Sequence, residues 1–99
     1  MIAAKDCQDL QEIRAGIDAI DRHLISLLQQ RLTYVLAASQ FKPDVESIPA
    51  PERVDSMLMD RLEWAKEEGI DPPFVIGLFH HIIPWYIDTQ IAWWRKNHA

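Results

Sequence analysis

Apolar residues recur at steps of three and four between positions 9 and 41, and this spacing predicts one long amphipathic helix. The apolar stripe consists of Leu10, Ile13, Ile17, Ile20, Leu24, Leu27, Tyr34, Val35, Ala38 and Phe41. Asp9 and Glu12 have the spacing of a capping box at the start of the helix. Pro43 disfavours the α conformation of Lys42, so we expect the helix to stop there.

The length of this helix constrains the assembly. At about 1.5 Å per residue it spans roughly 50 Å. The chain has 99 residues, and a compact monomer of that size has a radius of gyration of only about 13 Å. One copy therefore cannot cover the apolar stripe with its own core. We expect a two-fold homodimer in which the long helices pack side by side.

The second half of the sequence predicts two shorter helices. Pro51 suits the first turn of a helix that runs to about Glu68, after which Gly69 supplies a left-handed cap. Asp71 is placed to cap a third helix, and Pro84 inside that helix removes a backbone hydrogen bond, which predicts a kink. No segment reads as a strand. The predicted fold class is all-α, with three helices in a single domain of 99 residues.

The composition limits the partners and the compartment. Fifteen acidic residues outnumber ten scattered Lys and Arg, for a net charge of -5, which argues against a nucleic-acid surface. No stretch approaches the roughly 18 consecutive apolar residues of a membrane helix. A single cysteine, Cys7, cannot form an internal disulfide and fits a reducing compartment. We therefore expect a cytoplasmic protein that binds neither nucleic acid nor membrane.

Several polar residues lie among apolar neighbours on the predicted helices. Arg31 occupies the apolar stripe, and Lys42, eleven residues later, returns to nearly the same face. Arg53 and Gln90 stand beside apolar residues of the second and third helices. Such a cation commonly pairs with an internal acid or reaches solvent. Acids are few at the nearby inward-facing positions, which favours a ligand carboxylate as the partner.

Arg14 borders the same stripe but lies seventeen residues from Arg31. That separation is roughly 25 Å along a helix, which no small ligand spans. In an antiparallel dimer, however, the start of one helix lies near the middle of its partner. If Arg14 belongs to the same site as Arg31, it must come from the other subunit.

These five residues, Arg14, Arg31, Lys42, Arg53 and Gln90, resemble the site of the all-helical chorismate mutases. The chain is more closely similar to the isochorismate pyruvate lyases, which make salicylate for siderophores. The similarity extends through nearly the whole sequence. It includes the words Asp6-Cys7, Ile13-Arg14, Ile17-Asp18 and Ile20-Asp21 and the runs 34–42, 48–54 and 85–91.

The resemblance implies an intertwined homodimer with two equivalent active sites, each taking Arg14 from one subunit and the other residues from its partner. The substrate would be isochorismate and the products salicylate and pyruvate. The reaction in this family is viewed as pericyclic and needs no nucleophile, metal or cofactor. The segment 44–50 would be a loop that closes over the substrate as a lid.

The resemblance also implies roles for the five residues. Arg14 and Arg31 would bind the substrate carboxylates, with Arg53 as a supporting cation. Lys42 would donate to the departing ether oxygen or its adjacent carboxylate, and Gln90 would donate from the other side. Lys42, Gln90 and Arg31 are therefore the expected catalytic residues.

The choice between lyase and mutase depends on the second and third helices. Mutases of this family carry acids near the start of the second helix, where this chain has Ala50, Arg53 and Val54. The serine common in the third helix of mutases is matched by Tyr86. These differences favour the lyase, with weak chorismate mutase activity. The alternatives are a chorismate mutase that makes prephenate and a non-catalytic helical dimer. Pro84 departs from both groups and bears on the position of Gln90.

Other candidate residues have structural interpretations. His80 and His81 point about 100° apart on a helix and have no carboxylate at ligand spacing, so we expect no metal site. Cys7 has no helical base partner and is not expected to be a catalytic thiol. Core or dimer packing is the expected role of Trp85, Trp93 and Trp94.

Overall fold

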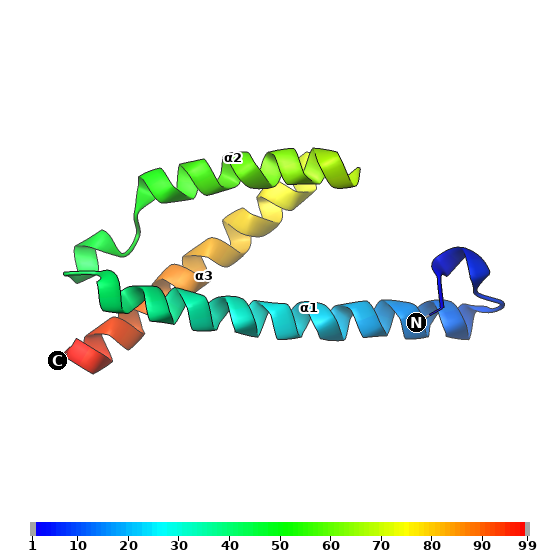
Figure 1. The fold of residues 1–99 in the computed structure, drawn as a ribbon, viewed down its shortest axis with the longest axis horizontal. Coiled ribbons are helices and arrows are strands. Elements are labelled where there is room, and N and C mark those ends of the chain that lie inside the picture. Colours follow the sequence, from blue (N-terminus) through cyan, green and yellow to red (C-terminus); the bar gives the residue numbers. More distant parts are fainter. Residues whose placement is uncertain (1, 99) are drawn as a thin grey trace. The chain divides into compact units, whose positions relative to one another are not determined.

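The computed structural model describes residues 2–98, and within that range it contains helices and no strand. The long helix α1 spans Leu10–Ala38, α2 spans Pro51–Glu68 and α3 spans Pro72–His98 (Figure 1). Three short 3-10 helices accompany them: η1 (Ala4–Asp6), η2 (Ser39–Phe41) and η3 (Val45–Ser47). The all-α class with three main helices is confirmed. Across the described range, none of the helices combines the length and apolar character needed to cross a membrane.

Both ends of α1 follow from local sequence. At the start, Asp9 Oδ1 accepts a hydrogen bond of 2.8 Å from the Glu12 backbone N–H. The Glu12 carboxylate reaches back to the backbone N–H of Gln8, also at 2.8 Å, rather than to that of Asp9. At the other end the last helical turn tightens into η2. Lys42 then adopts φ -100° and ψ 122°, the extended conformation that Pro43 favours.

The chain divides into two compact units, with the boundary after Tyr34. The first unit holds η1 and most of α1. No residue of α1 is buried, and five members of the apolar stripe retain between 45% and 57% of their exposure. They are Leu10, Ile17, Ile20, Leu24 and Leu27. The face predicted to pack in a dimer is thus open to solvent in a single copy of the chain.

The second unit contains a helical hairpin made by α2 and α3 (Figure 1). Gly69 closes it with φ 73°, while the N–H groups of Gly69 and Ile70 bond the carbonyls of Lys66 and Ala65. Asp71 Oδ2 accepts a bond of 3.1 Å from the Phe74 backbone N–H and caps α3. The predicted bounds of α2 and both predicted caps are confirmed.

The buried side chains within residues 2–98 all belong to the second unit. The apolar members are Ile48, Met57, Ala65, Ile83 and Tyr86. Arg61 of α2 joins the two helices from the side, because its guanidinium lies 4.7 Å from the Trp64 ring and 5.4 Å from the Phe79 ring of α3. The helix α3 continues through Pro84 as one element. Pro84 therefore does not end the helix, and the kink at this residue stays a prediction.

Replacement by alanine should have opposite effects on the free energy of unfolding at two glycines of this hairpin. Gly69→Ala should lower the free energy of unfolding by about 1 kcal/mol, because a Cβ is unfavourable at φ 73°. Gly77→Ala should raise it by about 0.8 kcal/mol, because Gly77 lies inside α3 and an added Cβ meets nothing within 4 Å. Urea unfolding at one fixed protein concentration measures both. Equal signs for the two variants would contradict this account.

Candidate functional site

Lys42 is held at three of its atoms. Its backbone N–H donates to Ser39 O at 3.1 Å, the remnant of the helical ladder in η2. Its carbonyl accepts a hydrogen bond of 3.2 Å from Trp94 Nε1 of α3. Its ammonium Nζ lies 3.3 Å from Ser47 O of η3. The side chain is half-buried. Lys42 is therefore a positioned cation rather than a freely moving surface lysine.

The segment after Lys42 is more ordered than the loop that the sequence predicts. Asp44 caps η3, because its Oδ1 accepts 2.9 Å from the Ser47 N–H and its carbonyl accepts 2.8 Å from Ser47 Oγ. Ile48 is only 3% exposed and fastens the segment to the core. Ala50 has a left-handed backbone with φ 40°, which turns the chain into α2 at Pro51. The ammonium of Lys42 is thus fixed to a short, capped turn.

Gln90 lies on α3 and is 6% exposed. Within residues 2–98 its side-chain amide has no hydrogen-bond partner. In that range neither amide atom is a fully buried atom without a partner, so the amide remains accessible to a polar ligand. Gln90 is one helical turn before Trp94, the residue that binds the Lys42 carbonyl. The second unit therefore brings Lys42 and Gln90, two predicted catalytic residues, to the same end of α3.

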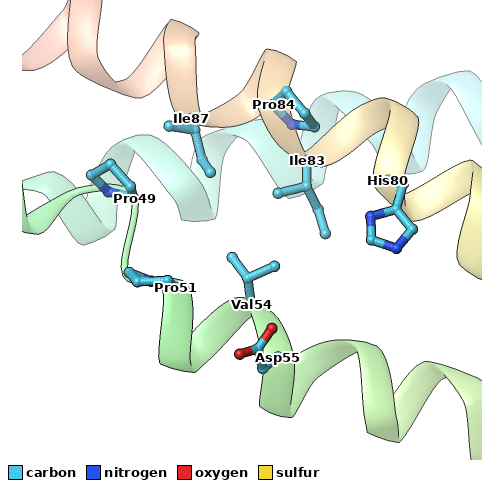
Figure 2. Close-up of a pocket in the computed structure, with 8 residues that line it drawn as sticks. All are labelled: Pro49, Pro51, Val54, Asp55, His80, Ile83, Pro84 and Ile87. Carbon is cyan, nitrogen blue, oxygen red and sulfur yellow. The ribbon is translucent and has the colours of Figure 1, made fainter.

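A pocket of about 300 Å³ lies between the start of α2 and the middle of α3. Its lining is Pro49, Pro51, Val54, Asp55, His80, Ile83, Pro84 and Ile87. Figure 2 shows Val54 of α2 and Ile83 and Ile87 of α3 pointing toward one another across it. Arg53 directly precedes Val54 and is exposed, and Ile87 is one turn before Gln90. An apolar wall therefore adjoins two of the predicted binding residues.

The remaining predicted residues belong to the first unit. Arg31 is half-buried and Arg14 is exposed, and both lie on α1. Their separation of seventeen residues, roughly 25 Å in an uninterrupted helix, means that a single chain does not bring them together.

Three of the four cationic residues of the predicted site form no ion pair with a local acid within residues 2–98. In the part of the chain that the structure describes, Arg14, Lys42 and Arg53 form no ion pair with a carboxylate. Lys66 contrasts with them, since it bonds Glu63 at 3.1 Å. Arg53, directly before the wall residue Val54, suits a ligand that carries a carboxylate on a small carbon skeleton.

Sequence reasoning missed two contributors to this arrangement. Trp94 was expected only to pack, yet it also bonds Lys42. The Ser47 carbonyl carries no sequence signal, because any residue supplies one. The spacing of four between Gln90 and Trp94 was visible, but it does not reveal a bond to a residue 52 positions away. His80 lines the pocket, and no group of three or more metal-ligating side chains occurs among residues 2–98.

A known protein family matches the part of the chain that carries the predicted site residues. The model for chorismate mutase type II matches residues 13–91, which include all five predicted site residues. The chain belongs to this family. An isochorismate pyruvate lyase of Pseudomonas aeruginosa is 51% identical over 97 residues, which cover 98% of this chain and 96% of the relative. The resemblance recognised from the sequence motifs is thereby confirmed.

A second relative carries a mutase name. The 4-amino-4-deoxychorismate mutase of Streptomyces pristinaespiralis is 30% identical over 76 residues, which cover 75% of this chain and 58% of the relative. The chorismate mutase type II family therefore includes relatives with two different named activities. Residues that differ between lyases and mutases must decide which activity a member has.

Proposed function

We propose that this chain is an isochorismate pyruvate lyase that converts isochorismate to salicylate and pyruvate without a cofactor, for siderophore synthesis in the cytoplasm. The observation that carries the proposal is the 51% identity to a lyase of that name over 98% of the chain. The aligned region covers 98% of the chain and therefore includes the three main helices that carry the proposed site residues.

The chemistry explains the types of residue. Isochorismate carries two carboxylates, one of them on an enolpyruvyl ether. In a concerted elimination the ether carbon–oxygen bond breaks as a ring hydrogen moves to the enolpyruvyl methylene, which gives pyruvate and an aromatic ring. The enzyme must hold the enolpyruvyl group over the ring and stabilise negative charge on the departing oxygen. Oriented cations and amide donors accomplish both.

We assign each of the five side chains a role that suits its charge and its hydrogen-bonding groups. Lys42 donates to the departing oxygen or its adjacent carboxylate, and Gln90 donates from α3 on the other side. Arg31 and Arg14 bind the carboxylates by paired N–H groups, with Arg53 as a supporting cation. Lys42 Nζ has three N–H groups and directs one at Ser47 O, so the other two can donate to the dicarboxylate.

The apolar wall supports lyase over mutase chemistry. Val54 stands at the start of α2, where mutases carry an acid, and lines the pocket with Ile83 and Ile87 (Figure 2). Tyr86, in place of a mutase serine, is 4% exposed. The side chains of Val54, Ile83 and Ile87 offer no hydrogen bond to a substrate hydroxyl, which suits an elimination that ends in an aromatic ring. Both reactions fold the enolpyruvyl group over the ring, so we propose a weak mutase side activity.

The exposed face of α1 supports an intertwined homodimer. Ile17 and Ile20 keep more than half of their exposure in one copy, and burial of such side chains contributes about 25 cal/mol per Å². An antiparallel α1 from a second copy would cover this face and supply Arg14 to the other subunit's site. In the proposed dimer the two units complete a single domain over residues 1–99.

The direct test is turnover of both substrates. Incubation of the purified chain with isochorismate should release salicylate, followed by its fluorescence. Prephenate from chorismate, measured in parallel, should form much more slowly. Faster prephenate formation would make the chain a mutase, and inertness toward both substrates would support the non-catalytic dimer.

Lys42→Ala should lower kcat by roughly 10²–10³-fold, because the variant lacks the donor to the departing oxygen. Its thermal midpoint should stay close to that of the wild type. Lys66→Ala is the matched control, since it removes an exposed lysine that bonds Glu63 on the same helix. An equal loss in the control, or unfolding of the Lys42 variant, would argue for a structural role.

The shared site predicts complementation between inactive subunits. Arg14→Ala and Arg31→Ala homodimers should each have little activity, since each lacks a carboxylate-binding guanidinium in both sites. After subunit exchange, a mixed dimer should contain one intact site and one doubly altered site. Recovery of up to a quarter of wild-type activity, by the statistics of random mixing, would be measured by salicylate release. Absence of recovery after proven exchange would refute the shared site.

A further inference from the structure

Trp94 contacts Lys42 through its indole N–H. Trp94 Nε1 donates to the Lys42 carbonyl at 3.2 Å, across 52 positions of sequence. The contact lies in the second unit and joins α3 to the junction between η2 and the Asp44 turn. Among the side chains of the described range, Trp94 is the donor to this carbonyl, so the main chain of Lys42 depends on one indole.

The indole of Trp94 is itself held in place. The imidazole of His98 stacks on it with ring centroids 4.2 Å apart and planes within 5°. His98 Nδ1 lies 2.9 Å from Trp94 O and donates to it in the tautomer with a proton on that nitrogen. A stacked, helix-borne indole has fewer orientations than an isolated one. The donor is therefore aimed at Lys42 before any substrate binds.

Trp94 also links the two catalytic groups. Residues four apart on a helix share a face, with Cβ atoms about 5–6 Å apart. Trp94 is four residues after Gln90, so the side chain that fixes Lys42 projects from the same helical face as Gln90. The span between Lys42 and Gln90 is then set by one rigid helical turn and one hydrogen bond.

We propose that Trp94 is a positioning residue that fixes Lys42 relative to Gln90 for the reaction. This inference rests on the proposed lyase function, because it assigns Trp94 a role through Lys42. Its basis is the distinction between two ends of the lysine. Nζ has two further N–H groups besides the one directed at Ser47 O and can shift to meet substrate, whereas the backbone carbonyl can remain on Trp94 throughout. Trp94 thus keeps the base of the side chain fixed while its tip moves.

Trp94→Phe tests this role, because it removes the N–H and keeps an aromatic ring to stack on His98. It should lower kcat with isochorismate by about 10-fold or more, since small misplacement of a catalytic group is costly. KM should stay within about twofold, because Arg14 and Arg31 still bind the carboxylates. Trp93→Phe is the matched control from the neighbouring position. An unchanged kcat for Trp94→Phe, or an equal loss in the control, would overturn the proposal.

A double-mutant cycle separates positioning from general packing. If Trp94 acts through Lys42, the loss caused by Trp94→Phe should shrink toward none in the Lys42→Ala background. Additive losses would overturn the proposal.

Hydrogen exchange provides a readout that does not need activity. The backbone amides of Lys42 and of residues 44–48 should exchange about three- to tenfold faster in Trp94→Phe than in the wild type or Trp93→Phe. Unchanged exchange would overturn the positioning role. Faster exchange in a protein whose wild type fails to cleave isochorismate would instead sustain the anchor and refute the proposed function.

Discussion

The apolar face of α1 is the constraint on which the rest of the structure depends. A helix of 29 residues with no buried side chain cannot be stabilised by its own apolar stripe in a single copy. The buried apolar residues of the described range gather instead around η3, α2 and α3. The proposed second copy, laid along α1, would cover the apolar stripe and would also complete the proposed site. In such an arrangement folding, assembly and catalysis are difficult to separate experimentally.

The hairpin of α2 and α3 has a different character, because local signals define it. Pro51 opens α2, Gly69 closes it and Asp71 opens α3, each by a backbone or capping interaction within a few residues. Side-chain contacts then reinforce the pairing, as the guanidinium of Arg61 does between Trp64 and Phe79. This independence allows the second unit to present Lys42, Arg53 and Gln90 from elements with fixed local geometry.

Sequence analysis predicted the elements well because their signals are local. Apolar periodicity, proline positions and caps are encoded within a few residues, so the bounds of α2 were predicted as observed. The resemblance to the family was recognised from short sequence segments distributed between Asp6 and Ile91. The bond from Trp94 to Lys42 and the turn capped by Asp44 were not predicted, since they depend on tertiary placement and on backbone atoms common to every residue. The assignment of Arg14 to a partner's site remains a prediction.

The left-handed conformation of Ala50 has a consequence for how this sequence can vary. A residue with a Cβ at φ 40° costs about 1–2 kcal/mol relative to a right-handed conformation. That cost is sustained because buried Ile48 on one side and Pro51 at the start of α2 on the other fix the path of the chain. Position 50 is thus closed to β-branched side chains and open to glycine, asparagine and aspartate. The side chain at position 50, between the Lys42 segment and α2, can therefore change to a polar or acidic one while the backbone keeps its left-handed conformation.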